Sequence, residues 1–359
     1  MLRIAIIGCG KVADQHVQAM RRIENCSIVS LCDRELLMAR QLGERIGVDN
    51  CYGSVEDLLT ATRPDVVHIT TPPQSHFALA EQCLRHGTHV YLEKPFTIDA
   101  TEAERLIQLA ETARLKITAG HNYQFTPEML RARAAIQRGF LGGTPVHLES
   151  YWPYSLDDQA YVGAVLSNRD HWVRKLPGQL FHNIISHGIA KLAEHLDDNI
   201  VELVAKAHQS EQLRGMGESD ICDELRVLLR DGRGTTAFFS FSTSIKPSVN
   251  LLRLYGRNGT LVADYMSGTL LAHRNRSYKS YLTYFVPPLI SARQHFRGAV
   301  GNMSAFIRRR LYQDFGMKEL FEQFYNCIRR DGPPPIPYRE IILTARIMDT
   351  IFAQIRPTI

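Results

Sequence analysis

A chain of 359 residues is longer than one ordinary domain, so two domains are the natural expectation. Its composition, 45% hydrophobic and 22% charged, is that of a globular protein and excludes a disordered or fibrous one. The formal net charge is +5, and no apolar run reaches the ~20 residues that cross a bilayer. The first residues lead directly into a strand pattern, so we expect a cytoplasmic protein without a signal peptide.

The cysteines indicate a reducing compartment. There are seven, scattered along the chain, and no two are spaced as C-x-x-C. Such a pattern is typical of buried thiols, so we expect neither a disulfide framework nor a metal site.

The first third of the chain alternates between short apolar runs and amphipathic segments. The expected strands are 2–7, 27–32, 65–69, 89–92 and 116–119, and the expected helices are 11–22, 34–46, 76–85 and 99–113. Strands that alternate with helices form right-handed βαβ units. We therefore predict an N-terminal α/β domain over residues 1–120 with a doubly wound parallel sheet.

After residue 120 the pattern changes to strands that follow one another closely. The expected strands are 146–151, 224–229, 235–242, 250–255 and 259–263, and a final helix is expected at 339–354. This predicts a second, α+β domain over residues 121–359 with a mostly antiparallel sheet. The final helix is a candidate to pack back on the first domain.

A glycine-rich turn joins the first expected strand to its helix. Gly8, Gly10, Lys11, Val12 and Ala13 fit the pattern G-x-G-x-x-[G/A], which brings a pyrophosphate close to the backbone and to a helix N-terminus. The alternative is a tight turn without a ligand. Three features favour a bound dinucleotide: the strand before the motif, the helix after it and an acidic residue at the end of the second strand.

That acidic residue, Asp33, is placed to accept hydrogen bonds from the adenosine ribose. Its charge would repel the 2′-phosphate of NADP, so we expect NAD as the cofactor. Arg34 comes next and would offset part of this repulsion, which leaves NADP open as an alternative.

Three further motifs lie where ligands bind in an open parallel sheet, beyond the carboxyl ends of strands, or on a helix of the second domain. Residues 71–76 (TPPQSH) follow the third expected strand, and residues 93–96 (EKPF) follow the fourth. Residues 181–188 (FHNIISHG) open a helix. Lys94 is thus expected beside a nicotinamide.

The chain resembles the glucose–fructose oxidoreductase/inositol dehydrogenase (Gfo/Idh/MocA) family over nearly its whole length. The resemblance rests on Gly8 and Gly10, Thr71-Pro72, Glu93-Lys94-Pro95 and the helical His187. The resemblance implies an N-terminal Rossmann domain and a C-terminal domain whose large open sheet forms homodimers or homotetramers. It also implies that Lys94 contacts the nicotinamide ribose and the reacting oxygen, and that His187 is the acid/base. A cationic Lys stabilises a developing alkoxide, and a His exchanges protons near neutral pH.

The alternatives without a catalytic role are that Lys94 is a solvated loop residue and that His187 is a core residue bonded to a backbone carbonyl. The chain also departs from the family. Asn183 stands where an Asp is usual, four residues before His187, so it can orient substrate but cannot ionise. Ala190 replaces a second Asp, and Gln124, in the segment 121–125, replaces an Arg.

The candidate site therefore has three groups of residues. The catalytic candidates are Lys94, His187 and Asn183. The cofactor-binding candidates are Gly8, Gly10, Lys11, Val12, Ala13, Asp33, Arg34, Thr71, Pro72, His76, Glu93, Lys94 and Asn122. The substrate-binding candidates are Lys94, Tyr123, Trp172, Arg174, Lys175, Asn183 and His187.

Aromatic and basic residues gather before the catalytic helix. They are Tyr151, Trp152, Tyr154, Tyr161, His171, Trp172, Arg174 and Lys175. Rings that stack on sugars and cations that bind anions suit a sugar or nucleotide-sugar. An ordinary rim loop whose aromatic residues pack into the core is the alternative.

A second basic stretch runs from Tyr265 to Gln313 and contains no Asp or Glu. Its basic residues are Arg274, Arg276, Lys279, Arg293, Arg297, Arg308, Arg309 and Arg310. It can bind a nucleotide-sugar diphosphate, touch an anionic membrane surface, or form an oligomer contact with a solvated face. Nucleic acid is not expected, because no recognised nucleic-acid motif accompanies the charge.

The sequence thus predicts an NAD(P)-dependent dehydrogenase or reductase that acts on a sugar or nucleotide-sugar. Two alternatives remain. One is an NAD-dependent glycosidase, which oxidises its substrate transiently and then eliminates the glycosidic bond. The other is a non-catalytic NAD(H)-binding regulator.

Overall fold

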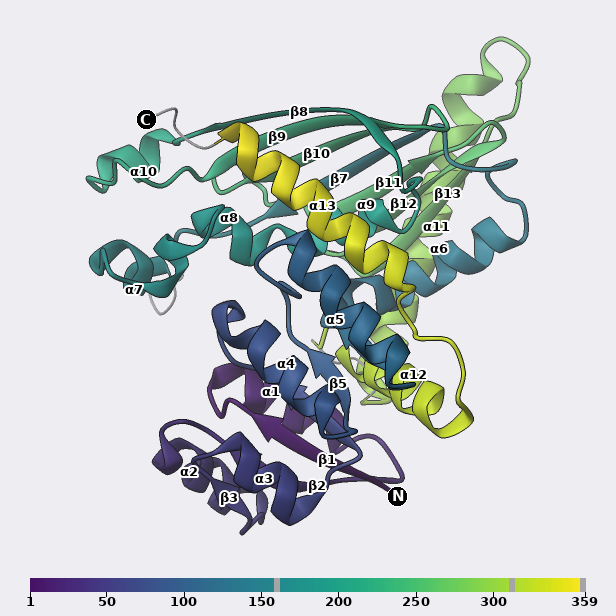
Figure 1. Cartoon of the computed structure of the whole chain (residues 1–359). Coiled ribbons are helices and arrows are strands. Elements are labelled where there is room, and N and C mark those ends of the chain that lie inside the picture. The colour runs from purple at the N-terminus through teal and green to yellow at the C-terminus, as the bar shows by residue number, and fades with distance from the viewer. Residues whose placement is uncertain (158–161, 310–313, 356–359) are drawn as a thin grey trace. The chain divides into compact units, whose positions relative to one another are not determined.

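The computed structural model describes residues 1–157, 162–309 and 314–355 (Figure 1). The chain divides into two compact units, Met1–Asn122 with Gly316–Asp349, and Tyr123–Phe315 with Thr350–Ile359. The segment Gly316–Asp349 thus belongs to the first unit, whereas the sequence-based boundary assigned residues 121–359 to the second domain, with the final helix as a candidate to pack back on the first. Tyr161 of the aromatic group and residues 310–313 of the basic stretch lie outside the described residues.

The first unit is built on a six-stranded parallel sheet in the order β3-β2-β1-β4-β5-β6. The strands are β1 (Leu2–Ile7), β2 (Cys26–Cys32), β3 (Cys51–Tyr52), β4 (Val66–Ile69), β5 (His89–Leu92) and β6 (Ile117–Ala119). Its helices are α1 (Lys11–Met20), α2 (Leu36–Ile46), α3 (Val55–Thr62), α4 (His76–Arg85), α5 (Ala100–Thr112), α12 (Met317–Arg330) and most of α13 (Tyr338–Ile355). This strand order is that of a doubly wound dinucleotide-binding sheet, so the predicted fold is confirmed.

Three elements of this unit, β3, α3 and α12, are additional to those expected from the sequence. The helix α12 buries Leu320, Phe321 and Phe324 completely, and it packs beside α1. Its Phe321 ring lies 4.9 Å from the ring of His16. A contact between segments so far apart in the chain is tertiary information that local periodicity does not contain.

The second unit is built on a seven-stranded sheet in the order β13-β12-β11-β7-β10-β9-β8. The strands are β7 (His147–Pro153), β8 (Ile200–His208), β9 (Glu224–Asp231), β10 (Thr236–Ser242), β11 (Leu251–Tyr255), β12 (Gly259–Asp264) and β13 (Thr269–Arg274). The pair β7–β10 is parallel, and the other neighbours are antiparallel. This confirms the predicted α+β domain. Both edge strands, β8 and β13, are additional to the prediction.

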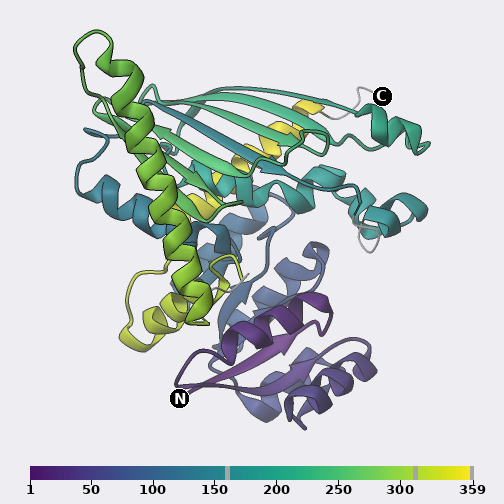
Figure 2. The ribbon, with the colours of Figure 1, turned by 180° about the vertical axis from the view of Figure 1, so that it is seen from behind.

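The helices of the second unit are α6 (Pro127–Gln137), α7 (Val162–Ser167), α8 (Gln179–Ile184), α9 (Ser186–Ala193), α10 (Glu211–Gly215) and α11 (Leu282–Ile307). The helix α9 packs on β7 and β10, α6 packs on β12 and β13, and Figure 2 shows the curved sheet from behind. The Ser150 hydroxyl of β7 donates a hydrogen bond to the Gly188 carbonyl of α9 at 3.0 Å. A Cβ on Gly188 would lie 2.4 Å from the Phe239 ring of β10. Gly188 therefore allows the close approach that fixes α9 on the sheet.

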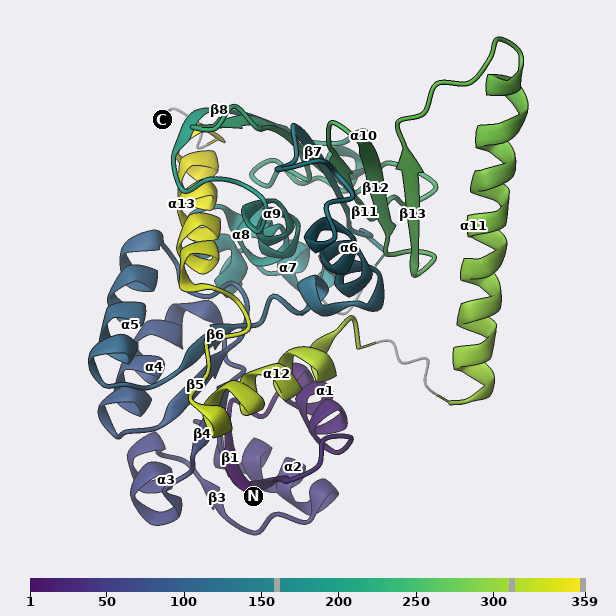
Figure 3. The ribbon, with the colours of Figure 1, turned by 90° about the vertical axis from the view of Figure 1, so that its right-hand side faces the viewer.

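The long helix α11 runs beside the edge strand β13 and contains no buried residue (Figure 3). None of the described helices combines the length and the apolarity that a membrane-spanning segment needs.

Candidate active site

The glycine turn of the first unit has the geometry that a dinucleotide requires. Gly8 has φ +94°, and a Cβ there would lie 2.7 Å from the Thr71 Cγ2 atom. Gly10 precedes α1, and a Cβ on it would meet no atom within 4 Å. Crowding within the protein thus explains Gly8, whereas Gly10 leaves open space at a helix N-terminus. That space and the helix dipole suit the pyrophosphate of NAD.

Of the three residues Lys11, Val12 and Ala13, one is buried and two are exposed. Ala13 is fully buried, whereas Lys11 and Val12 are exposed at the start of α1. A surface pocket beside the turn is lined by Cys9, Gly10, Lys11, Asp14, Met38, Gln41, Glu44 and Arg45. The turn, its helix and this pocket can hold a cofactor.

Asp33 connects the end of β2 to the glycine turn. Its Oδ2 atom accepts a hydrogen bond from the Cys9 backbone N–H at 2.7 Å, and Oδ1 accepts one from Glu35 at 2.9 Å. The carboxylate is therefore held in place and keeps lone pairs for a ribose. The exposed Arg34 guanidinium lies 3.9 Å from the Glu35 carboxylate, a distance that fixes neither side chain.

His76 holds the loop at Thr71-Pro72 against the loop at Lys94-Pro95. Its Nε2 faces the Thr71 carbonyl at 2.8 Å, and its Nδ1 faces the Pro95 carbonyl at 3.0 Å. The ring is fully buried, and burial lowers its pKa although the carbonyls oppose this. In the structure His76 thus joins two loops that were expected to line the cofactor.

The carboxylate of Glu93 is anchored by a buried chain of hydrogen bonds. Its Oε1 is 2.9 Å from His16 Nε2, and His16 Nδ1 is 3.0 Å from His68 Nδ1. The chain continues from His68 Nε2 to the Tyr325 hydroxyl at 2.9 Å. The other carboxylate oxygen accepts the Lys94 backbone N–H at 3.0 Å.

This chain fixes Lys94 at the carboxyl end of β5. Burial opposes ionisation of Glu93, but the hydrogen bond and charge of His16 and the charge of Lys94 outweigh it, so the pKa of Glu93 is lowered. A Cβ on Gly120 would lie 2.9 Å from Glu93 Oε1, so a larger residue there would displace the anchored carboxylate. Burial lowers the pKa of Lys94, and Glu93 opposes that shift. The Lys94 backbone is therefore fixed, and its ammonium is buried within the influence of the Glu93 charge.

His187 lies near the start of α9 in the second unit and is 8% exposed. Its ring centroid is 4.8 Å from that of Tyr123 and 5.3 Å from that of Trp152. Asn183 lies in α8, and the two short helices meet at Ile185. The continuous helix expected over these residues is thus two helices. His182 is buried and stacks on Phe352 at 4.9 Å.

Lys191, which the sequence analysis did not select, lies one helical turn after His187. Its Nζ atom is 4.1 Å from the Tyr265 ring centroid and 4.8 Å from that of Trp152, which also contacts His187. Nζ donates a hydrogen bond to Asn250 Oδ1 at 3.1 Å. Burial lowers the pKa of Lys191 to about 7, against the opposing charge of Glu128. The only signal in the sequence is a Lys within an apolar helical segment.

Replacing Lys191 by methionine is expected to make stability depend less on pH. The unfolded chain retains this proton up to about the ordinary lysine pKa of 10.5, whereas the folded chain releases it near 7. The unfolded state thus binds more protons between these values, and the stability of the unaltered protein rises with pH. Between pH 7 and 9.5 this contributes roughly 3 kcal/mol, which the variant lacks.

Urea unfolding of both proteins at the two pH values measures this difference. Lys206→Met, at an exposed position of β8, is the matched control and should change with pH as the unaltered protein does. Equal pH dependence in Lys191→Met and in the unaltered protein would refute the buried, weakly basic Lys191.

Gln124, where the family usually has Arg, contacts the end of α9. Its Nε2 donates to Glu194 Oε2 at 3.2 Å and to the Ala190 carbonyl at 3.4 Å. Arg133 binds both oxygens of the same Glu194 carboxylate, at 2.5 and 2.9 Å. Neither Arg133 nor Glu194 was selected from the sequence, because only the fold brings α6 to the end of α9.

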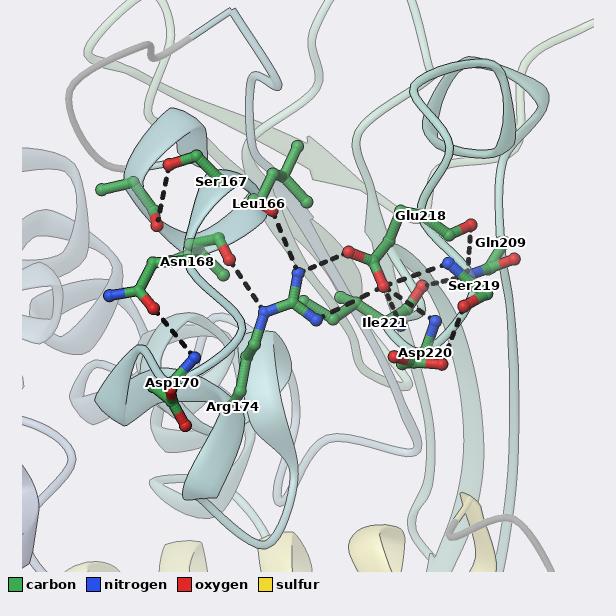
Figure 4. Close-up of polar contacts among 12 residues, drawn as sticks. Leu166, Ser167, Asn168, Asp170, Arg174, Gln209, Glu218, Ser219, Asp220 and Ile221 are labelled. Carbon is green, nitrogen blue, oxygen red and sulfur yellow. Dashed lines mark hydrogen bonds and ion pairs between the residues drawn. The ribbon is translucent and has the colours of Figure 1, made fainter.

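Arg174, expected to bind substrate, forms an ion pair within its own unit (Figure 4). Its guanidinium donates to Glu218 Oε2 at 2.5 Å and to the Val165 carbonyl at 2.8 Å. These bonds hold the segment after α7 to the loop that carries Glu218. Trp172 is partly exposed and Lys175 is exposed in the same short helix, Trp172–Lys175.

The remaining candidates also have defined places. Pro72 precedes the short helix Pro73–Ser75, and Asn122 begins another, Asn122–Phe125, where it is buried. The Tyr123 ring stacks on Phe315 at 5.0 Å. Among the described residues, no group of three His, Cys, Asp or Glu side chains is placed to hold a metal ion.

The parallel sheet, the glycine turn and Asp33 define the first unit as the NAD-binding part of an oxidoreductase. Residues 2–121 match the model of the oxidoreductase family with an NAD-binding Rossmann fold. A UDP-N-acetylglucosamine 3-dehydrogenase of Acidithiobacillus ferrooxidans is 30% identical over 279 residues, which cover 76% of this chain and 77% of that one. The chain belongs to the Gfo/Idh/MocA family of NAD-binding oxidoreductases.

Solved structures share the fold over nearly the whole chain. The WlbA dehydrogenase from Bordetella pertussis, in complex with NADH and UDP-GlcNAcA, has a TM-score of 0.78 at 17% identity and covers 100% of this chain and 96% of its own. An NAD-binding oxidoreductase from Klebsiella pneumoniae has a TM-score of 0.77 at 20% identity, covering 99% and 97%. The family, the fold class and the NAD cofactor expected from the sequence are therefore confirmed.

Proposed function

We propose that this oxidoreductase transfers a hydride between the nicotinamide and a hydroxyl or keto carbon of a sugar, most specifically a nucleotide-sugar. The observation that carries the proposal is the anchored Glu93 carboxylate, which holds the Lys94 backbone at the carboxyl end of β5, in the unit that binds NAD. The relative named a UDP-N-acetylglucosamine 3-dehydrogenase and the structural neighbour bound to UDP-GlcNAcA support the nucleotide-sugar.

In this proposal two side chains act on one substrate hydroxyl. The Lys94 ammonium donates a hydrogen bond to the oxygen and stabilises the negative charge that develops there. The His187 imidazole accepts the hydroxyl proton, and the alcohol carbon becomes a ketone carbon as it loses its hydride. Bound NAD supplies the hydride acceptor. Asn183 orients the substrate through its amide, since it cannot take up a proton.

The second unit offers groups suited to a sugar. The rings of Tyr123 and Trp152 contact His187 and present flat apolar surfaces on which a sugar can stack. Trp172 and Lys175 are the proposed rim contacts, and Lys175 supplies a cation for a diphosphate. Arg174, occupied by Glu218, supports this rim by holding its backbone.

A panel of UDP-sugars and free sugars, incubated with NAD or NADP, tests the proposal through the nicotinamide absorbance. Formation of NADH with a nucleotide-sugar supports it. Cleavage of an aryl glycoside without net NADH would instead identify a glycosidase. Binding of NADH without turnover of any sugar would favour the regulator.

Asp33→Asn is expected to reduce the preference for NADH over NADPH about tenfold. The change removes the charge that repels a 2′-phosphate and weakens a charged hydrogen bond to the ribose. Fluorescence titration with both dinucleotides measures the ratio of dissociation constants. Asp49→Asn, at an exposed position of the same unit, is the control. Tighter binding of NADPH than of NADH by the unaltered protein would overturn the role of Asp33.

We also propose that copies of the chain associate as a homodimer or homotetramer through the second sheet. The paired residues Val204 of β8 and Leu228 of β9 are both exposed on one face of this sheet. An apolar face of this kind suits a subunit contact. The mass in solution, measured by light scattering, tests the association, and a monomer at all concentrations would contradict it.

A further inference from the structure

The helix α11 contacts the second unit through one narrow, polar face. The Gln294 side chain bonds to both backbone groups of Ala272 in β13, at 2.7 and 3.1 Å. One turn further on, a Cβ on Gly298 would lie 2.7 Å from the Thr269 side chain. One turn beyond that, the Asn302 amide donates to the Ser267 carbonyl at 2.6 Å. Residues spaced by four share one helix face, so this face points to β13.

The opposite face of α11 is apolar and exposed. Six large side chains there are between 48% and 72% exposed: Phe285, Leu289, Phe296, Val300, Met303 and Ile307. Their spacing along the chain places them in one stripe that points away from the sheet. Single exposed apolar residues are ordinary on a protein surface, but a continuous stripe of this size marks an interaction surface.

Positive charges lie along one side of this stripe, in a stretch of the chain that contains no acidic residue. Arg293 and Arg297 are exposed on α11, and Arg308 and Arg309 are exposed just after it. The chain has no Asp or Glu from Tyr265 to Gln313. A surface that covers this helix must therefore offer apolar contact to the stripe and negative charge to its borders.

We propose that α11 lies in the surface of an anionic lipid bilayer, with the apolar stripe among the acyl chains and the arginines at the phosphate headgroups. A helix with Phe and Leu on one face and Arg along one border of that face has the chemistry of an interfacial helix. At 26 residues it is roughly 39 Å long, so it presents an extended edge to the membrane plane. This inference goes beyond the proposed function and does not depend on the substrate.

The charge pattern favours a membrane over a second copy of the chain. In a two-fold contact between two α11 helices, the same surface meets itself. That contact would bring the basic, acid-free stretches of both copies together without a compensating carboxylate. A nucleic acid would neutralise the arginines but leave the apolar stripe in water. An anionic bilayer satisfies both requirements.

Co-sedimentation of the full chain with vesicles tests the proposal. We expect binding to vesicles of phosphatidylcholine mixed with phosphatidylglycerol, whose surface is negatively charged, and little binding to phosphatidylcholine alone. The double variant Arg293→Gln/Arg297→Gln should bind about 30-fold more weakly, which corresponds to roughly 1 kcal/mol for each cation. The double variant Leu289→Ser/Phe296→Ser should bind about 100-fold more weakly.

Matched controls remove side chains of the same kinds at positions outside α11. Arg214→Gln/Arg330→Gln deletes two exposed cations, and Leu37→Ser/Met216→Ser deletes two exposed apolar side chains outside α11. Both should bind the anionic vesicles as the unaltered protein does. In a third variant, Phe296→Trp, the fluorescence of the added indole should shift to shorter wavelength when anionic vesicles are added, because the ring enters an apolar phase.

Two results would overturn the proposal. One is equal sedimentation with and without vesicles for a protein whose circular dichroism shows it to be folded. The other is a dimer in light scattering that Leu289→Ser/Phe296→Ser converts to a monomer, with no vesicle binding by the unaltered protein. That second outcome would assign the stripe to a second copy of the chain.

Discussion

Replacing Lys94 by alanine is expected to lower turnover about 1,000-fold, because the variant lacks the charge that stabilises the developing alkoxide. Binding of NAD should change little. The glycine turn, α1 and Asp33 are independent of the Lys94 side chain, and the Glu93 carboxylate remains bound to His16. The loss should therefore fall on turnover and not on the dissociation constant of NADH, which titration of the protein fluorescence measures.

Two further variants separate charge from position. Lys94→Arg keeps a cation but replaces a compact ammonium by a larger planar group, so it should recover only part of the activity. Lys206→Ala, at an exposed position on β8, is the control and should turn over as the unaltered protein does. Full activity in Lys94→Ala would require the proposed mechanism to be abandoned.

His187→Ala is expected to lower turnover by a factor of roughly 100 to 10,000, the contribution of a positioned acid/base. Added imidazole should restore part of the rate, since the small base can enter the space that the side chain leaves between Tyr123 and Trp152.

The control for His187 is His208→Ala, which alters an exposed histidine of β8. The double variant Lys94→Ala/His187→Ala tests whether both side chains serve one reacting oxygen. Residues that act as a unit lose activity non-additively, so the double variant should be little slower than the slower single variant. Multiplicative losses, or no rescue of His187→Ala by imidazole, would assign the two residues to separate roles.

Much of the cofactor-binding unit could be predicted because its signals are local. The strand β1 and the helix α4 have the same bounds in the structure as in the sequence analysis, since buried parallel strands and amphipathic helices leave a clear apolar pattern. The glycine turn could also be predicted, because a positive φ and the close approach of Thr71 restrict the residue type at Gly8. Elements with weak periodicity, such as the two-residue β3 and the exposed edge strand β8, were missed.

What the sequence by itself determined is the class of protein, an NAD-binding oxidoreductase with a parallel sheet and a second α+β domain, because turn geometry and apolar periodicity act over a few neighbouring residues. Only the tertiary structure showed that Tyr325 of α12 joins His68 and His16 in holding Glu93, that Lys191 is buried against the Trp152 ring that contacts His187, and that Arg174 is paired with Glu218. Each of these depends on segments that are distant in the chain. Burial and pairing determine the pKa and the contacts of a charged group, and both arise only when such segments pack together.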